Sequence, residues 1–329
     1  MRVFLTHNPE DLQAYYGRAL PELEAIADVV PNPLDRDLST AELIEHSAGC
    51  DVIAAHRATP GEAALFASHE RLVAFLRCAV DISTVDVDAA SANGVLVARA
   101  DTSYVASTAE LALGLYLDLS RGIADSTHDY RLGVPPPQRP GRQVRGQTAA
   151  ILGLGLIGSY LADLLVALGL RVLAHDPGPV SPPAGVEMGE RRDVVAAADV
   201  VFPLAPATEA THHLVDHALL ALMKPGALLV NVSRGELMDE AAVAAALDSG
   251  RLGGLAMDVG MAPDQRPSPD LAERPCVVST PHLGGLTPEN ADAQARSSVE
   301  QVAAILAGEM PPRGVNPGSA ARLRQWWAS

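Results

Sequence analysis

A glycine-rich hexapeptide near the middle of the chain, Gly153-Leu154-Gly155-Leu156-Ile157-Gly158, constrains the fold more than any other feature. It follows a short apolar run that ends at Leu152, and it leads into a helical pattern. The next apolar run is closed by Asp176, which lies 23 residues after the first glycine. This order of strand, glycine turn, helix, strand and acidic residue is typical of a dinucleotide site.

Each position of the hexapeptide has a physical role in such a site. Gly153 permits the tight turn, Gly155 lets the backbone approach a pyrophosphate, and Gly158 lets the helix pack closely on the strand. A helical pattern, Tyr160–Leu168, follows, and the free N–H groups and partial positive charge of a helix start favour phosphate. Leu156 and Ile157, between the glycines, are also expected to contact the cofactor. The carboxylate of Asp176 is placed to accept hydrogen bonds from an adenosine ribose. We therefore expect a bound dinucleotide.

Composition limits the class of protein further. The chain has 329 residues, 48% hydrophobic and 19% charged, which is enough for two folded domains. A net charge of −16 argues against nucleic acid or an anionic membrane as a partner. Three widely spaced cysteines form no disulfide or metal pattern, and the first apolar run is too short for a signal peptide. We expect a cytoplasmic protein without a metal.

Strand-like apolar runs alternate with helical patterns along the whole chain, which favours parallel sheets. In the first hundred residues the expected strands are Val3–Leu5, Ala27–Val30, Val52–Ala55, Leu72–Leu76 and Val95–Val97. From residue 148 on they are Thr148–Leu152, Arg171–Ala174, Val200–Phe202, Ala227–Asn231, Leu255–Met257 and Val277–Ser279.

Helix boundaries are predicted from caps and breakers. Ser39 and Glu42 form a capping-box pattern, and a further helix is expected at Gly61–Ser68. Longer helices are expected at Ser107–Arg131, at Asp239–Ser249 and from Pro288 to Leu306. The proline-rich segment 134–141 is expected to be a surface loop.

The expected architecture is α/β with two doubly wound parallel-sheet domains. A Rossmann dinucleotide-binding domain, residues 101–288, is inserted into a smaller flavodoxin-like substrate domain made of residues 1–100 and 289–329.

Three chemically capable residues follow consecutive strands at the carboxyl edge, where open α/β sheets bind ligands. Arg234 can hold a carboxylate through two hydrogen bonds, or it is simply a loop arginine. His282 can exchange a proton near neutral pH, or it is a polar turn residue. Asp258 can accept a hydrogen bond from a nicotinamide carboxamide, or it caps a turn. Their convergence on the edge that carries the glycine loop favours the functional interpretation of all three.

With these residues in place, the chain resembles the D-isomer-specific 2-hydroxyacid dehydrogenase family over nearly its whole length. The matching segments, in the family's order, are Arg77–Ala90, Ala109-Glu110, Gly153–Gly158 with Asp176, Pro206-Ala207-Thr208, Asn231–Glu236, Asp258 and Thr280–Gly285. The resemblance implies that Pro206 and Thr208 also contact the cofactor.

The resemblance also implies a reaction: hydride transfer between a nicotinamide and C2 of a small 2-hydroxy or 2-keto acid. Arg234 would bind the substrate carboxylate and polarise the carbonyl, and His282 would exchange the proton. NAD is expected rather than NADP, because Asp176 would repel a 2′-phosphate. The family usually forms dimers, so a homodimer is expected.

Two departures from the family pattern concern the site. The family normally has a Glu that hydrogen-bonds the catalytic His, but the corresponding position here is Pro263. Either Asp264, one residue later, takes this role or no carboxylate does. The family's glycine-rich substrate loop is Cys78-Ala79-Val80-Asp81 here. Backbone N–H groups of Ala79, Val80 and Asp81 can still bind a carboxylate, although the charge of Asp81 must point away or be paired.

The substrate is left open by the sequence. Arg57 follows the strand Val52–Ala55 where phosphoglycerate-using relatives carry Arg, so it either binds a distal anion or is a solvated loop residue. A glyoxylate- or hydroxypyruvate-reductase-like enzyme, a phosphoglycerate dehydrogenase-like enzyme and a phosphite-oxidising enzyme are the alternatives. A protein that senses NAD(H) without turnover is an alternative of another class.

Overall fold

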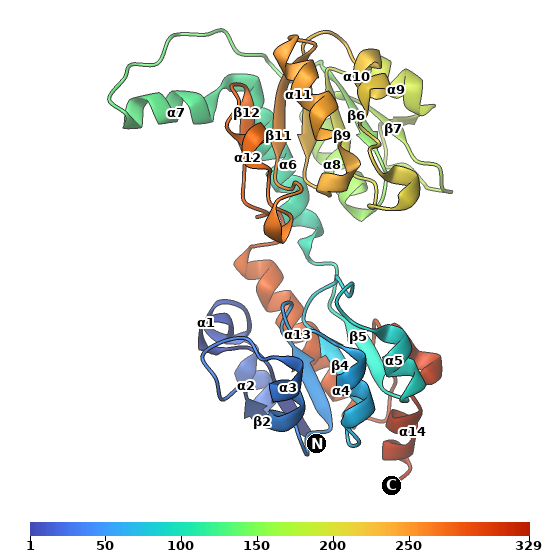
Figure 1. The fold of residues 1–329 in the computed structure, drawn as a ribbon. Helices are drawn as coiled ribbons and strands as arrows, with labels where there is room; N and C mark the ends of the chain where they lie inside the picture. Colours follow the sequence, from blue (N-terminus) through green and yellow to red (C-terminus); the bar gives the residue numbers. More distant parts are fainter. The chain divides into compact units, whose positions relative to one another are not determined.

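The computed structural model describes residues 1–329, apart from the side chain of Asp264. The chain divides into two compact units. Unit 1 comprises Met1–Ser103 and Thr287–Ser329, and unit 2 comprises Tyr104–Leu286. Each unit contains one parallel sheet with helices packed on it (Figure 1). The predicted fold class, two doubly wound parallel-sheet domains, is confirmed.

The sheet of unit 1 has five parallel strands in the order β2-β1-β3-β4-β5. They are β1 (Arg2–Leu5), β2 (Asp28–Pro31), β3 (Val52–Ala55), β4 (Ala74–Arg77) and β5 (Leu96–Arg99). This is the flavodoxin-like order, in which the direction of winding reverses between β1 and β3. Alternate residues of β1 and β3 enter two separate cores: Val3 and Val52 lie in one, and Phe4 and Ile53 lie in the other. Both faces of the sheet are therefore buried.

Helices cover the two faces of this sheet. They are α1 (Pro9–Asp11), η1 (Leu12–Tyr16), α2 (Leu20–Glu24), α3 (Thr40–His46), α4 (Ala63–Ser68), α5 (Val87–Ala92), α13 (Pro288–Leu306), η5 (Pro317–Ser319) and α14 (Ala321–Trp327). On one face α13 contacts η1, α2 and β4, so the end of the chain completes the core of its beginning. On the other face α4 lies between α3 and α5. The predicted capping box of Ser39 and Glu42 is present at the start of α3.

The sheet of unit 2 has seven parallel strands in the order β12-β11-β10-β9-β6-β7-β8. They are β6 (Thr148–Leu152), β7 (Arg171–His175), β8 (Val186–Met188), β9 (Val200–Pro203), β10 (Ala227–Asn231), β11 (Leu252–Met257) and β12 (Val277–Ser279). The winding reverses between β6 and β9, as in dinucleotide-binding sheets. The sequence predicts six of these strands. It misses β8, a three-residue edge strand with no buried side chain.

The helices of unit 2 are α6 (Tyr104–Arg121), α7 (Ile123–Arg131), α8 (Leu156–Ala167), α9 (Arg191–Ala197), η2 (Glu209–Thr211), α10 (His217–Leu222), η3 (Gly235–Leu237), α11 (Glu240–Asp248), η4 (Pro263–Gln265) and α12 (Pro269–Ala272). Residues of α6 and α8 share one core with the sheet, and residues of α9, α10 and α11 share the other. The predicted N-cap Asp239 accepts hydrogen bonds from two backbone N–H groups of α11.

The prediction of a single helix from Ser107 to Arg131 is wrong. Gly122 adopts a left-handed conformation with φ of 63° and separates α6 from α7. The Asp118 carboxylate accepts a hydrogen bond from the N–H of Ala124 at 2.8 Å, so it satisfies a donor at the start of the second helix. Gly is the residue that most readily adopts this conformation, and here it changes the direction of the chain.

No helix among the described residues is long and apolar enough to cross a bilayer.

Candidate functional site

The carboxyl edge of the unit 2 sheet brings together the predicted cofactor and catalytic segments. The residues that end its strands pair in register: Leu152 with His175 and Pro203, Asn231 with Met257, and Met257 with Ser279. The glycine loop, Asp176, Arg234, Asp258 and His282 all follow these strand ends directly. The sheet itself thus places them along one edge.

The glycine loop lies at the point where the winding of the sheet reverses. Gly153 has φ of 102°, and a Cβ atom there would lie 2.7 Å from the backbone N of Ala205, in the loop after β9. A Cβ on Gly158 would lie 2.4 Å from the carbonyl oxygen of Gly153. A Cβ on Gly155 would meet no atom within 4 Å. Two glycines are therefore required by packing, whereas Gly155 faces open space at the start of α8.

That open space fits the pyrophosphate of a dinucleotide. Gly155 is the N-cap of α8, and the first N–H to bond within the helix is that of Ser159, to the carbonyl of Gly155 at 2.9 Å. The N–H groups of Leu156 and Ile157 precede it, as donors at a helix start do. Donors at the positive end of a twelve-residue helix, beside a glycine without a side chain, suit an anion.

Asp176 closes the same loop from the neighbouring strand. One carboxylate oxygen accepts the N–H of Leu154 and the other accepts the N–H of Gly178, both at 2.8 Å. The side chain is half-buried, so it braces the glycine loop while part of its surface is exposed. The loop after β9 carries Pro206 and Thr208, and its turn is closed by hydrogen bonds from Thr211 to Pro206 and to Thr208.

Arg234 follows β10 in a loop that packs tightly on its neighbour. A Cβ on Gly235 would lie 2.4 Å from the carbonyl carbon of Gly260, in the loop after β11. Asn231 donates from its side chain to the carbonyl of Arg234 at 2.9 Å and fixes the turn. The half-buried guanidinium of Arg234 donates to the carbonyl of Ser233 at 2.8 Å. Among the described ion pairs none involves Arg234, so its charge is not neutralised by a carboxylate there.

Asp258 organises the loop that carries His282. Its buried carboxylate accepts hydrogen bonds from the Thr280 hydroxyl at 2.6 Å, the Leu283 N–H at 2.7 Å and the Gly284 N–H at 2.8 Å. The backbone N–H of His282 donates to the carbonyl of Asp258 at 2.9 Å, and His282 has φ of 61°. Of the two roles open to Asp258, these contacts support the turn-capping one. Its contact with a nicotinamide stays a prediction.

The sequence offered turn capping as one role for Asp258, but it gave no sign that the Thr280 hydroxyl is a partner of this carboxylate. A Thr that follows a strand and precedes Pro281 gives little local signal of its partner 22 residues earlier. The prediction for Asp264 falls on a side chain outside the described residues.

The predicted substrate residues of unit 1 follow β3 and β4. Arg57 is exposed, directly after buried His56. Ala79 accepts the N–H of Ala100 at 3.0 Å through its carbonyl, and Ala79 and Val80 are half-buried. The Asp81 carboxylate accepts both the N–H and the hydroxyl of Ser83, at 2.9 and 3.0 Å. The carboxylate of Asp81 thus binds within its own turn.

Among the described residues, Asp11, Asp37 and His56 form a group whose donor atoms lie within 4.8 Å of one another. Burial, followed by the charges of Arg57 and Arg77, lowers the pKa of His56 to about 4. The guanidinium groups that disfavour a proton on His56 also disfavour a cation bound next to it. We assign no metal to this group, and a protein without a metal stays a prediction.

The chain is similar to known proteins over most of its length. A family model described as "D-isomer specific 2-hydroxyacid dehydrogenase, NAD binding domain" matches residues 113–284. A D-3-phosphoglycerate dehydrogenase of Mycobacterium leprae is 38% identical over 270 residues, which are 81% of this chain and 51% of the relative. The enzyme of that name from Mycobacterium tuberculosis is 38% identical over 293 residues, which are 86% of this chain and 54% of the relative. The chain therefore spans about half the length of these relatives.

A solved structure with the same fold is the TT0316 protein of Thermus thermophilus. It superposes with a TM-score of 0.83 at 29% identity, over 96% of this chain and 100% of that one. The family match extends over β6 to β12 and includes the glycine loop, Arg234 and His282. Residues 113–284 are an NAD-binding domain, and the chain belongs to the D-isomer specific 2-hydroxyacid dehydrogenase family.

Proposed function

We propose that this protein is an NAD-dependent oxidoreductase that transfers a hydride between the nicotinamide and C2 of a small 2-hydroxy or 2-keto acid. The observation that carries the proposal is the placement of Arg234 and His282 at the ends of β10 and β12, on the edge that holds the glycine loop. The half-buried, always-charged guanidinium suits the carboxylate of such an acid.

Each residue has a distinct role in this proposal. The nicotinamide, when bound, would supply the hydride as NADH or accept it as NAD⁺, and the protein supplies orientation and charge. Arg234 binds the substrate carboxylate and polarises the C2 carbonyl. His282 donates a proton to the C2 oxygen during reduction and removes it during oxidation. Asp258 holds the backbone of the His282 loop through three hydrogen bonds. A general acid of this kind contributes a factor of about 10²–10⁴ to the rate.

We assign the nucleotide-binding role to unit 2 and a substrate-binding role to unit 1. In unit 1, the backbone of Ala79, Val80 and Asp81 would contact the substrate carboxylate, and Arg57 would bind an anion at the distal end of the substrate. The relatives named as D-3-phosphoglycerate dehydrogenases support a substrate with a distal phosphate. Unphosphorylated acids such as glyoxylate and hydroxypyruvate are the alternative.

Consumption of NADH with a panel of keto acids tests this function: 3-phosphohydroxypyruvate, hydroxypyruvate, glyoxylate, pyruvate and a branched-chain keto acid. We expect turnover with at least one of them and saturation at a lower concentration of NADH than of NADPH. An Arg234→Gln variant is the control, with the same NADH affinity and little turnover. Binding of NADH without turnover of any acid would contradict the proposal and favour a protein that senses NAD(H). Reduction of NAD in the presence of phosphite tests the phosphite-oxidising alternative.

We further propose a homodimer formed through unit 2. Ile123 and Tyr130 of α7, with Leu132 and Val134 of the loop that follows, are 52–70% exposed. In Figure 1, α7 and this loop extend from the rest of unit 2. Clustered exposed apolar side chains of this size are typical of a surface that a second copy covers. Sedimentation at micromolar concentration should give a dimer, and a monomer would contradict this proposal. A cytoplasmic location stays a prediction.

A further inference from the structure

Arg77, at the end of β4, is a buried cation bound almost entirely by backbone carbonyls. Its side chain is part of a residue only 3% exposed. The guanidinium donates to the carbonyls of His56 at 3.2 Å and Thr59 at 2.5 Å, and it also donates to the carbonyl of Arg57. Further bonds reach the carbonyl of Asp81 at 3.3 Å and the hydroxyl of Thr84 at 3.0 Å.

These acceptors belong to the two loops that carry the proposed substrate contacts of unit 1. Segment 56–59 follows β3 and includes Arg57, whereas segment 81–84 follows the Ala79–Asp81 backbone. Because a guanidinium presents its donors in a fixed plane, five bonds to both loops define their positions relative to β4. A lysine ammonium at the same position cannot reproduce this planar fork.

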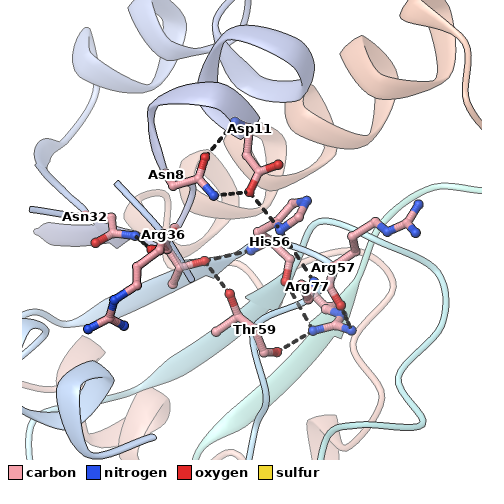
Figure 2. A network of polar contacts seen from close by, with 10 residues as sticks. Asn8, Asp11, Asn32, Arg36, His56, Arg57, Thr59 and Arg77 are labelled. Atoms are coloured by element: carbon pink, nitrogen blue, oxygen red, sulfur yellow. Dashed lines mark hydrogen bonds and ion pairs between the residues drawn. The ribbon is translucent and has the colours of Figure 1, made fainter. Parts of the chain in front are cut away.

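The loop after β3 is held from its other side as well. Thr6, after β1, accepts the N–H of His56 at 2.8 Å and shares a hydrogen bond with the Thr59 hydroxyl at 2.6 Å. The strands β1 and β3 flank the point where the winding of this sheet reverses, which is where open α/β sheets bind ligands. Figure 2 shows the resulting network from Asp11 through His56 and Thr59 to Arg77.

Arg57 differs from the rest of the loop in the direction of its side chain. Figure 2 shows the Arg57 guanidinium pointing away from the network while its carbonyl is held by Arg77. Its side chain is exposed, and among the described residues no ion pair involves it. The loop thus has a fixed backbone, and no described ion pair neutralises the charge of Arg57.

We propose that Arg77 is a positioning residue for substrate recognition: by binding the carbonyls on both sides of Arg57, it holds that guanidinium where it meets the distal anion of the substrate. This inference rests on the proposed function. Arg77 touches no substrate itself, since its donors are directed at the two loops.

The test is the Arg77→Lys variant, which keeps the charge and loses the planar fork. With 3-phosphohydroxypyruvate we expect KM to rise at least tenfold and kcat to change less than threefold. With glyoxylate, which has no distal anion, KM should change less than threefold. The NADH Kd should be unchanged, because the cofactor residues lie in unit 2. An equal rise in KM for both substrates would overturn the proposal that Arg77 acts through Arg57. A wild-type enzyme that reduces glyoxylate but not 3-phosphohydroxypyruvate would overturn it as well.

A double-mutant cycle with Arg57→Ala separates positioning from general damage. In the Arg57→Ala background, Arg77→Lys should raise KM for the phosphorylated acid less than twofold further. A full tenfold additional rise would contradict the proposal. Arg71→Lys is the matched control, because Arg71 also lies next to β4 but its exposed side chain binds Asp51 at 2.8 Å. It should leave KM at the wild-type value.

Two further measurements test the role of Arg77 in holding the loops. Thr84→Val removes one acceptor of Arg77, so it should raise KM for the phosphorylated acid about threefold even if Arg77→Lys folds poorly. Amide hydrogen exchange in Arg77→Lys should be at least tenfold faster in segment 56–60 and unchanged in segment 153–158. Unchanged exchange in segment 56–60 would overturn the inference. Absence of turnover by the wild-type enzyme would instead refute the proposed function.

Discussion

The two sheet edges that carry the proposed site are built by different means. At the edge of unit 2, backbone meets backbone: glycine positions touch neighbouring loops, and Asp176 and Asp258 accept main-chain N–H groups. At the edge of unit 1, a backbone bridge between Gly61 and Val85 also joins the loops, but buried polar side chains add to it, and the guanidinium of Arg77 binds both loops. The unit 2 edge combines close-packed glycines with carboxylates that accept main-chain N–H groups, whereas the unit 1 edge adds a buried cation that donates to main-chain carbonyls.

This difference shows why a motif marks one edge and not the other. Where two backbones pack so closely that a Cβ atom would clash, only glycine is tolerated. The need for glycine is therefore visible in the local sequence. A loop held by a distant guanidinium requires only an acceptor carbonyl, which every residue has. Arg77 contributes to the unit 1 loops in this way, through bonds to segment 56–59 that span 18–21 residues of sequence.

The largest effect expected at the unit 2 edge follows from replacement of His282. In His282→Asn, kcat for keto-acid reduction should fall by a factor of about 10²–10⁴, because the proton donor is lost. Asn tolerates the left-handed conformation that His282 adopts, so the loop should persist. Steady-state kinetics measure the loss, and NADH fluorescence titration should give the wild-type Kd. A variant that keeps more than a tenth of the wild-type kcat would remove His282 from the reaction.

Substitution of Gly158 and of Gly155, in the same loop, distinguishes a glycine needed for packing from one needed for cofactor binding. Gly158→Ala should lower the free energy of unfolding by about 1–3 kcal/mol or more, because its Cβ would lie 2.4 Å from a backbone oxygen. Gly155→Ala should leave stability nearly unchanged and raise the NADH Kd about tenfold, since its Cβ points into open space. Urea unfolding and NADH titration of both variants test this pair. Equal effects of the two substitutions on stability would contradict it.

The buried histidines make the unit 1 edge sensitive to pH. Burial lowers the pKa of His56 from 6.5 to about 4, and burial together with the neighbouring His56 lowers that of His7 to about 3. The unfolded chain therefore binds more protons below pH 6.5, and stability must fall as the pH decreases from about 7 to 4. His56 alone should account for about 3 kcal/mol over this range.

Urea unfolding at a series of pH values measures this dependence. His56→Gln should reduce its slope between pH 6.5 and 4, whereas replacement of the exposed His212 by Gln should leave the slope unchanged. If His56→Gln retains the full wild-type slope, the buried imidazole of His56 is not the source of the acid sensitivity.

Much of the fold follows from patterns that need no partner. Val52–Ala55, Thr148–Leu152, Ala227–Asn231 and Val277–Ser279 are strands with the predicted bounds, and Pro288–Leu306 is a helix with the predicted bounds. Each is a run of suitable periodicity that ends at a cap, a glycine or a change of polarity. The helix prediction failed at Gly122, where the apolar pattern continues but the backbone turns. The periodicity of apolar residues indicates which face of a helix is buried. It does not indicate where a glycine changes the direction of the backbone.

The amino-acid sequence alone determined the α/β class, the dinucleotide loop and the identity of Arg234 and His282 as candidates, because the alternation of strand and helix patterns and the glycine spacing are local properties. Only the tertiary structure decided that Asp258 holds the His282 loop and that Arg77 holds the loop of Arg57. Those roles depend on bonds between segments far apart in the chain. A buried polar group forms hydrogen bonds with the groups that the packed fold places near it, and these partners cannot be identified from the local sequence.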